Sequence, residues 1–253
     1  MDIQFTVLLL IILALYWEYI DSAFGMLYGT ALTPILLIMG YTPTEVVPSI
    51  LISQAIGGSV ASWRHHDKRN AIFNKNSKDF RIALLIFISG IIAVVIGAII
   101  GKVIPAKVLA IYIGFLVIVM GIIILLKQHF KFSWKKVALI GFISSFNKAI
   151  SGGGFGPLVA SGLVISGKSG KSSIGITDFA EAPICFAGFI VWIFLNKVPD
   201  YYLFIPLCVG AAIGGFFGPS TLARIKSNAT IVKILGFTSI FLGIWTLLKT
   251  FAE

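Results

Sequence analysis

The stretch IALLIFISGIIAVVIGAII, which runs from Ile82 to Ile100, contains no charged residue and no proline. An uninterrupted apolar run of this length is what an α-helix needs to cross the hydrocarbon core of a bilayer. A transmembrane β-strand would instead alternate polar and apolar residues in segments of about ten. The stretch therefore predicts a membrane-spanning helix.

The composition extends this prediction to the whole chain of 253 residues. Hydrophobic residues make up 58% of it, charged residues only 12%, and the mean hydropathy is +0.99. A soluble domain has about 45–50% apolar and about 25% charged residues. These values exclude an ordinary soluble enzyme, a disordered chain and a disulfide-framed secreted module. We expect an all-α, polytopic integral membrane protein.

Apolar segments recur along the rest of the chain. Six of them are long enough for full spans, at about 46–62, 82–100, 108–126, 173–195, 201–219 and 231–249. Two further pairs of segments are shorter, 4–20 with 24–39 and 137–150 with 155–166, and each pair is split by polar or glycine-rich residues. We interpret each pair as a re-entrant or broken helical hairpin.

The chain also repeats itself. The segment FGMLYGTALTPILLIMGYTP (24–43) aligns with SGGGFGPLVASGLVISGKSG (151–170) at an offset of 127 residues. Repeats with broken segments at matching positions are typical of secondary transporters. We therefore predict two transmembrane repeats, residues 1–127 and 128–253, each made of one hairpin and three transmembrane helices.

The distribution of positive charge favours an inverted relation between these repeats. If each hairpin enters and leaves the membrane on the same side, each repeat crosses the membrane three times. Three is an odd number, so the second repeat starts on the opposite side and has the opposite orientation. With the loop 64–81 in the cytoplasm, this arrangement gathers more of the 20 Lys and Arg residues on the cytoplasmic side than a parallel one does. Both termini then lie outside the cell membrane. The same topology accounts for the net charge of +10, so we expect no nucleic-acid partner.

The strongest local signal for a site is FNKAISGGGFGP, residues 146–157. Consecutive glycines free the backbone from the helix, and the proline then suits the first turn of a new helix. Backbone amides at such a helix N-terminus attract anions, and a lysine adds positive charge at membrane depth. The candidate substrate-binding residues here are Asn147, Lys148, Ser151, Gly152, Gly153, Gly154 and Gly156. The alternative is a hinge, or close helix packing through small residues.

The first repeat carries a counterpart of this segment, DSAFGMLYGT (21–30). Its Asp21 stands where the second repeat has Lys148, so the two hairpin tips either form an ion pair or lie on opposite sides of a cavity. The candidate substrate-binding residues of this half are Asp21, Ser22, Gly25, Gly29 and Gln54. Hydroxyls at membrane depth often bond only their own helix backbone, which is the alternative for Ser22.

The helix predicted after the second hairpin contains TDFAEAP, with Asp178 and Glu181 three residues apart on one face. Carboxylates in an apolar span are costly unless they are paired or hydrated. One of them can pair with Lys148, and the other is the candidate for a coupling proton, because burial favours the neutral form of a carboxyl. A purely structural role near the cytoplasmic end of the helix is the alternative.

Three other features do not point to a site. The sequence GLVISGKS (162–169) fits the phosphate-binding pattern GxxxxGK[ST], but no strand precedes it. His65 and His66 have no carboxylate or cysteine set nearby in the sequence, so we expect a solvated loop there and no metal site. Cys185 and Cys208 lie in apolar runs without metal-ligand spacing, so we expect buried thiols, no metal and no cofactor.

In the segments around the two breaks, the sequence resembles the TauE/SafE sulfite-exporter family of membrane anion permeases. The resemblance rests on GMLYGTALTPILLIMGYTPTEVVPSILISQAIGGSVASWRHH (25–66) and SGGGFGPLVASGLVISGKSGKSSIGITDFAE (151–181). It implies a secondary carrier that moves sulfite, sulfonates or related organosulfur anions, often outward. The family's two signature breaks fall on Gly25, Gly29, Pro34, Gly152, Gly153, Gly154, Gly156 and Pro157. Many members repeat the glycine triplet where this chain has Gly25-Met26-Leu27, which argues against a symmetric two-sided site.

The expected function is therefore secondary transport of a small sulfur-containing anion, such as sulfite or a sulfonate like sulfoacetate. We expect export by alternating access within the lipid bilayer, coupled to protons. We expect no enzymatic activity, because the sequence offers no nucleophile–base pair. The alternatives are an anion channel and a non-transporting accessory subunit. The sequence leaves the oligomeric state open, a homo-oligomer included.

Overall fold

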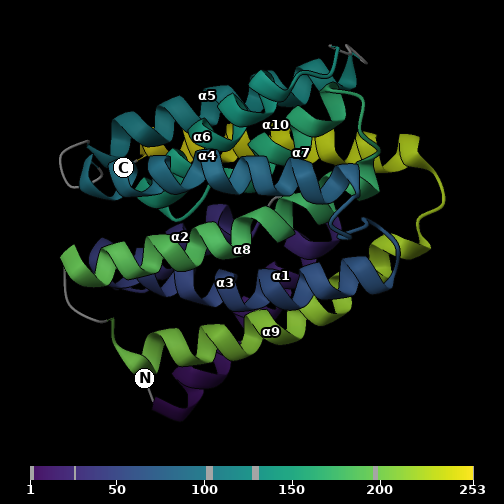
Figure 1. Cartoon of the computed structure of the whole chain (residues 1–253). Coiled ribbons are helices and arrows are strands. Elements are labelled where there is room, and N and C mark those ends of the chain that lie inside the picture. Colours follow the sequence, from purple (N-terminus) through teal and green to yellow (C-terminus); the bar gives the residue numbers. More distant parts are fainter. Residues whose placement is uncertain (1–2, 26, 101–104, 127–130, 196–198, 253) are drawn as a thin grey trace.

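The computed structural model describes residues 3–25, 27–100, 105–126, 131–195 and 199–252. Within these ranges the chain folds into α-helices without a β-strand, which confirms the prediction of an all-α membrane protein (Figure 1). The helices are α1 (Ile3–Phe24), α2 (Tyr28–Ile38), α3 (Pro43–Asp67), α4 (Lys78–Ile100), α5 (Ala106–Leu125), α6 (Trp134–Ser151), α7 (Phe155–Ile165), α8 (Gly170–Leu195), α9 (Tyr201–Arg224) and α10 (Asn228–Ala252).

Six helices in the described part of the chain are long and apolar enough to cross a membrane. They cover Gln4–Phe24, Thr44–Asp67, Lys78–Ile100, Gly170–Leu195, Tyr201–Arg224 and Asn228–Phe251. The first of them differs from the prediction, which ended the segment at residue 20 as a short half of a hairpin. Helix α1 has 22 residues and continues to Phe24. It is not interrupted at Glu18, because this side chain is buried against neighbouring helices instead of facing lipid.

The helix boundaries follow the offset of 127 found in the sequence. Helices α2 and α7 each have 11 residues, and they start at Tyr28 and Phe155. The same offset separates the starts of α3 and α8 and the ends of α1 and α6. The two breaks have the same local cause, because Gly25 and Gly152 adopt φ angles of 78° and 72°, a region that favours glycine.

The equivalent helices α3 and α8 pack against each other in antiparallel directions. On α3, Leu51 lies next to Gly188 of α8, whereas His65, farther along α3, lies next to Gly175, farther back along α8. Helices α5 and α10, whose starts are 122 residues apart, pack against each other in the same manner. Helix α1 lies along α9, just as α6 lies along α4, so each hairpin helix packs on a helix of the other half.

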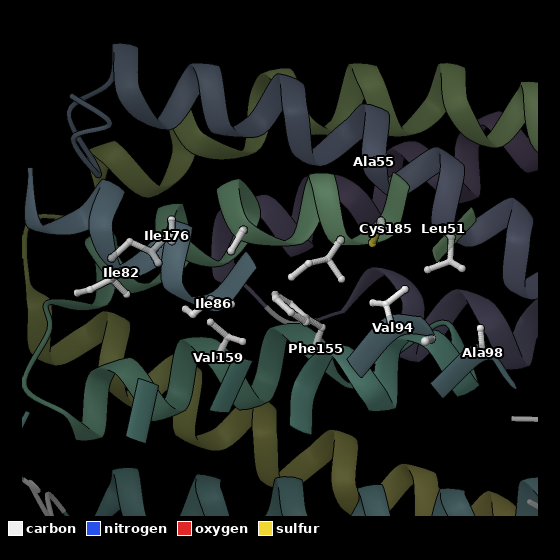
Figure 2. Packing of buried hydrophobic residues seen from close by; sticks show 14 of the residues in the cluster. Leu51, Ala55, Ile82, Ile86, Val94, Ala98, Phe155, Val159, Ile176 and Cys185 are labelled. Atoms are coloured by element: carbon white, nitrogen blue, oxygen red, sulfur yellow. The ribbon is translucent and has the colours of Figure 1, made fainter. Parts of the chain in front are cut away.

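The largest hydrophobic cluster involves residues of α3, α4, α6, α7 and α8. Phe155 is fully buried within it, with Val159 on one side and Val94 on the other (Figure 2). Because Phe155 is the first residue of α7, its burial anchors the start of this helix, just after the second break, in the cluster.

Close helix contacts elsewhere depend on small residues, as is common in membrane proteins. Gly210, Gly214 and Gly218 follow one another at intervals of four on α9, and each packs on the backbone of α1. A side chain at any of these positions would push the two helices apart.

The two ends of the bundle differ in charge. Both termini lie at one end of the helices, and the α3–α4 and α9–α10 connections lie at the other (Figure 1). This second end is basic, because Arg64 lies in the last turn of α3, Lys78 begins α4 and Arg224 ends α9.

Candidate functional site

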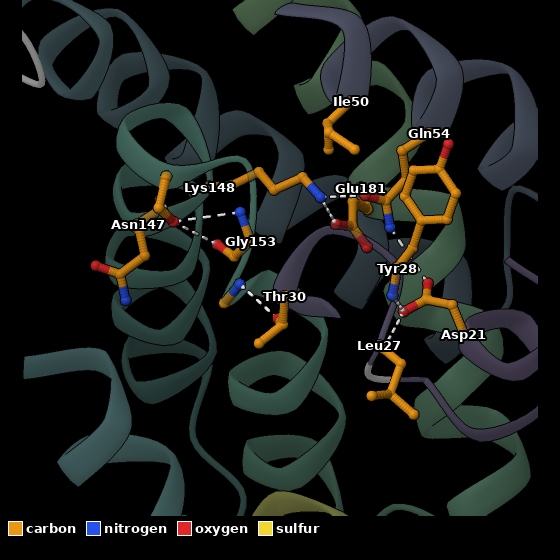
Figure 3. A network of polar contacts seen from close by, with 12 residues as sticks. Asp21, Leu27, Tyr28, Thr30, Ile50, Gln54, Asn147, Lys148, Gly153 and Glu181 are labelled. Carbon is orange, nitrogen blue, oxygen red and sulfur yellow. Dashed lines mark hydrogen bonds and ion pairs between the residues drawn. The ribbon is translucent and has the colours of Figure 1, made fainter. Parts of the chain in front are cut away.

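The two predicted breaks meet inside the protein. Gly29, in the first turn of α2, packs so closely on the second break that a Cβ there would overlap the carbonyl oxygen of Gly152. Gly153 packs on the backbone of Thr30, and the amide of Gly154 donates to the Thr30 hydroxyl (N···Oγ1 3.2 Å; Figure 3). Segments that are far apart in the sequence therefore form one site.

The second break is shaped by its own residues. Gly152 follows α6 and Gly154 precedes α7, both with left-handed φ angles (72° and 79°) that residues with a Cβ rarely adopt. The hydroxyl of Ser151 donates to the carbonyl of Asn147 (2.8 Å) and accepts from the amide of Gly153 (3.2 Å). Helix α7 starts at a glycine N-cap and has no acidic residue in its first turn, so the positive end of its dipole has no carboxylate from its own first turn.

Lys148 is the centre of a polar network beside this break. Its side chain is only 1% exposed, and its Nζ lies 2.8 Å from Oε1 of Glu181. The same ammonium donates a hydrogen bond to Oε1 of Gln54. Figure 3 shows Lys148 reaching from α6 toward Glu181 and Gln54. Because a buried charge is stable only when it is paired, Glu181 supplies the counter-charge of Lys148.

Gln54 connects Lys148 with the first break. Its Nε2 donates to Oδ2 of Asp21 (3.2 Å), while its Oε1 accepts from Lys148. Asp21 and Lys148 were predicted either to form an ion pair or to face each other across a cavity. The structure instead places the Gln54 amide between them, as a bridge that donates to the carboxylate and accepts from the ammonium.

The N-termini of the two short helices have opposite surroundings. At α2, Oδ1 of Asp21 accepts hydrogen bonds from the amides of Leu27 (2.5 Å) and Tyr28 (2.9 Å). An anionic group thus already occupies this helix end. At α7, the position equivalent to Asp21 is the cation Lys148, and the amide of the N-cap residue Gly154 donates to the neutral hydroxyl of Thr30. The second break is therefore the one that is suited to an external anion.

Asp178 belongs to a second buried cluster, one turn from Glu181 on α8. Its Oδ2 lies 3.0 Å from Nε2 of His65, and the two side chains are 2% and 0% exposed. The prediction that His65 lies in a solvated loop is wrong. The histidine belongs to the last turn of α3, where Gly175 on α8 leaves room for its ring. Asn70, from the loop after α3, donates from Nδ2 to Nδ1 of His65 (3.0 Å).

Two predicted site residues lie apart from the Lys148 network. Asn147 is buried, but Figure 3 shows its side chain pointing away from Lys148, and its Nδ2 and Oδ1 have no hydrogen-bond partner in the described structure. The hydroxyl of Ser22 donates to the carbonyl of Glu18 (2.7 Å) in its own helix. Gly25 closes the end of α1, and Gly156 is buried in the first turn of α7.

Sequence reasoning missed three buried polar residues near the site, namely Glu18, His65 and Asn70. Glu18 is 1% exposed, and its Oε2 has no partner in the described structure. The signal for Glu18 was present, because a carboxylate in an apolar run is as unusual there as at Asp178. His65 and Asn70 lie in a basic, polar stretch that gave no indication of burial.

The described residues include no group of three His, Cys, Asp or Glu side chains that could hold a metal ion. The buried cation and the adjacent helix N-terminus are suited to an anion instead.

Comparisons with known proteins are consistent with this geometry. The family model "Sulfite exporter TauE/SafE" matches residues 9–246, which is most of the chain. A curated relative, "Probable membrane transporter protein YtnM" of Bacillus subtilis (strain 168), is 27% identical over 190 residues. The match covers 69% of this chain and 61% of the relative, so the chain spans less than two thirds of that protein's length. No solved structure gives a significant match.

Proposed function

The chain belongs to the sulfite exporter TauE/SafE family, and we propose that it is a secondary transporter that exports a small sulfur-containing anion. The proposed substrate class comprises sulfite, sulfonates such as sulfoacetate, and related organosulfur anions. The observation that carries the proposal is the buried ammonium of Lys148 beside the N-terminus of α7, whose first turn contains no acidic residue. A buried cation and a helix N-terminus both favour a negative ligand, and neither favours a cation.

The first break supports this assignment, because it contains an internal example of the interaction. The Asp21 carboxylate accepts two amide hydrogen bonds where α2 begins. A sulfite or sulfonate group has oxygens of similar charge and can accept the same kind of bond at the start of α7. Lys148, in the position equivalent to Asp21, would then neutralise the ligand.

The pair formed by Lys148 and Glu181 supports coupling to protons. An anion that binds the Lys148 ammonium competes with the Glu181 carboxylate, which lies 2.8 Å away. A displaced and buried carboxylate without a counter-charge is strongly unfavourable. A proton on the carboxyl removes this cost, so binding of the anion is accompanied by uptake of a proton. Glu181 and Asp178 are the candidate carriers.

The balance of buried charges also supports coupling to protons. Four carboxyl side chains are buried around the site, but Lys148 is the one buried lysine or arginine in the described residues. The four carboxyl groups are Glu18, Asp21, Asp178 and Glu181. A low-dielectric interior does not hold such an excess of negative charge, so some of these groups carry protons.

The arrangement of helices supports alternating access by two inverted repeats, residues 1–127 and 128–253. The equivalent helices α3 and α8 pack antiparallel, as do α5 and α10, which is the relation expected of inverted repeats. The candidate site lies where the breaks of the two repeats meet, so rocking of one repeat against the other would expose it to either side in turn. The basic end of the bundle would face the cytoplasm, with both termini outside the cell membrane.

The first test is ligand binding to the purified protein in detergent, measured as a shift of the melting temperature. The panel contains sulfite, sulfate, thiosulfate, sulfoacetate, taurine, acetate and chloride. A ligand that binds only the folded state at a hundred times its Kd stabilises it by about 2.7 kcal/mol. We expect a sulfur-containing anion to raise the melting temperature of the wild type but not of Lys148→Ala.

The matched control is Lys168→Ala, since Lys168 also pairs with a carboxylate, Asp79 (2.5 Å), but lies outside the site. This variant should keep the anion-dependent shift. A shift that survives in Lys148→Ala would contradict the site, and unitary currents in planar bilayers would indicate a channel in place of a carrier. Flux into proteoliposomes that saturates with substrate is the expected result.

A further inference from the structure

We propose that His65, held by Asn70 and bonded to Asp178, relays the coupling proton between Asp178 and the basic end of the helix bundle. This inference rests on the proposed function and deepens it, because it separates the path of the proton from the site of the anion. The relay would begin at the polar connection after α3 and end at Glu181, the counter-charge of Lys148.

The position of His65 suits such a relay. The residue lies in the last turn of α3, two positions before the exposed Asp67, yet its own side chain is fully buried. On the inner side it contacts Asp178, which shares a helix face with Glu181. The imidazole therefore lies between the surface of the protein and the carboxyl groups of the anion site.

The hydrogen bonds of Asn70 determine which ring nitrogen of His65 carries the proton. The Asn70 Nδ2 donates to the carbonyl of Pro219 on α9 (2.9 Å), and this carbonyl can only accept. The same amide nitrogen lies 3.0 Å from Nδ1 of His65 and donates to it with its second hydrogen. Nδ1 is therefore the unprotonated nitrogen. Nε2 carries the hydrogen and donates it to Asp178 Oδ2 (3.0 Å).

This tautomer is ready for proton transfer in one direction. A proton that enters at Nδ1 makes the ring an imidazolium, and the Nε2 proton then passes to the Asp178 carboxylate. One proton enters and one leaves, and the ring is left protonated at Nδ1. Before the proton can enter, the Asn70 amide must turn, because its N–H occupies the lone pair of Nδ1. It then offers its oxygen to the new Nδ1–H, so Asn70 is a positioning residue of the relay.

The charged groups that act on this pair are themselves part of the anion site. Asp21 and Glu18 on α1 and Glu181 on α8 all influence Asp178 electrostatically. Arg64, next to His65 in the sequence, instead binds Asp67 and the Ser220 hydroxyl. A proton on Asp178 therefore responds to whether Glu181 and its neighbours are charged.

The second repeat shows that packing alone does not require a histidine here. The position equivalent to His65 at the 127-residue offset is Trp192, whose Nε1 donates to the carbonyl of Ala149 (3.0 Å). The position equivalent to Asp178 is Leu51. The same corner of the fold is thus filled by an indole and an aliphatic side chain, which do not titrate in the physiological range. The buried acid–imidazole pair is therefore absent from the equivalent positions of the other half, both of which the structure describes.

The test uses the full chain in proteoliposomes with sulfoacetate as the probe, because both of its acid groups stay ionised near neutral pH. Proton movement is followed with a pH dye inside the vesicles, and counterflow of labelled sulfoacetate is measured in parallel. We expect His65→Gln to lower sulfoacetate-driven proton movement by about tenfold or more. Counterflow, which needs no net proton movement, should stay within about twofold of the wild type by the same reasoning.

The neighbouring histidine provides the matched control. His66 is only partly buried and accepts a hydrogen bond from the amide of Phe73, so His66→Gln should leave both readouts unchanged. Proton movement at the wild-type rate in His65→Gln would overturn the relay. Loss of counterflow together with proton movement would also overturn it, because the histidine would then be structural.

A second measurement does not depend on transport and covers the case in which His65→Gln fails to fold. The chain has three histidines, so His66→Gln with His129→Gln leaves His65 as the single imidazole for ¹⁵N NMR. We expect a proton on Nε2 and none on Nδ1, and loss of this preference in Asn70→Leu. A ring protonated at Nδ1 in the parent protein would overturn the relay. Failure of the proposed function looks different, since the wild type would then show neither an anion-dependent melting shift nor flux.

Discussion

Gln54 of α3 and Glu181 of α8, which are 127 residues apart in the sequence, hold the same ammonium group, that of Lys148. Asp21 and Lys148 are separated by the same offset. The network therefore consists of two pairs of equivalent positions that carry different chemistry. A twofold arrangement of helices becomes an asymmetric site, because a carboxylate is replaced by a lysine in one pair and a glutamine by a glutamate in the other.

Competition between Glu181 and the substrate for Lys148 leads to a pH-dependence prediction. In the wild type, the anion binds together with a proton, so its affinity should fall by up to about tenfold for each pH unit once Glu181 is ionised in the free protein. Glu181→Gln removes the competing carboxylate. We expect this variant to bind the anion about tenfold more tightly at neutral pH and to lose most of the pH dependence. Calorimetric titration between pH 5 and 9 measures both effects, and an unchanged slope would contradict the exchange.

Substitution of Gln54 tests the bridge between the two halves. Gln54→Glu places a third carboxylate next to Asp21 and Lys148, so we expect the affinity for the anion to fall by about tenfold through charge repulsion. Gln54→Leu should instead lower the stability by about 1–3 kcal/mol, because Asp21 loses a buried donor. Ser59→Ala is the control, since the Ser59 hydroxyl bonds only its own helix at Ala55. Equal affinities in Gln54→Glu and Ser59→Ala would argue against contact of this network with substrate.

The contact between the breaks depends on Gly29. A Cβ at this position would overlap the carbonyl oxygen of Gly152, and backbone cannot move aside as a side chain can. We expect Gly29→Ala to lower the stability by about 1–3 kcal/mol or more and to abolish anion binding. Gly58→Ala is the matched control, because a Cβ there meets Ala182 at an ordinary contact distance of 3.4 Å. Thermal unfolding of both variants, with and without anion, measures the loss of stability and the loss of anion binding.

Asp79 forms hydrogen bonds with both the loop after α3 and the connection before α8. Its carboxylate accepts from Lys168 Nζ (2.5 Å), the Ser172 hydroxyl (2.9 Å) and the amide of Ile72 (3.0 Å). Lys168, which the phosphate-loop pattern in the sequence contained, thus binds a carboxylate of its own chain. Lys168→Ala removes one partly exposed ion pair and should cost about 0–1 kcal/mol.

Asp79→Ala removes all three of these bonds at once. We therefore expect it to cost more, about 1–3 kcal/mol, because two other donors lose their acceptor as well. Melting temperatures of the two variants, measured at the same detergent and salt concentration, give the comparison. A larger loss in Lys168→Ala would show that the lysine has a role beyond this pair.

The proposed orientation can be tested with single cysteines in a background that lacks Cys185 and Cys208. Lys226→Cys lies in the α9–α10 connection at the basic end, and Asp200→Cys lies just before α9 at the opposite end. We expect an impermeant thiol reagent to label Asp200→Cys in intact cells and Lys226→Cys only in inverted vesicles. Labelling of both from the same side would contradict the proposed topology.

The elements of this protein could be predicted because their causes are local. A long apolar run needs no partner to specify a membrane span, and consecutive glycines end a helix wherever it packs. The breaks at Gly25 and Gly152, the charged residue before each of them and the carboxylates on α8 were all visible in the sequence. The end of α1 was placed too early because Glu18 looks like an interruption until its burial is known.

The sequence indicated that Asp178 or Glu181 pairs with Lys148, and the structure shows that Glu181 does. The partners of the other polar side chains could not be predicted, because each pair is formed by segments brought together from distant parts of the chain. Lys148 was expected near a carboxylate, but packing of α3 against α8 selects Glu181 and places Gln54 between Lys148 and Asp21. The same packing buries His65 against Asp178, although the sequence around His65 predicts a solvated loop. Hydropathy and glycine spacing act through the local backbone, whereas burial and charge pairing depend on which helices meet. The spans and breaks can therefore be predicted from the sequence, whereas the partner of each charged side chain is determined by the contact between the two halves of the fold.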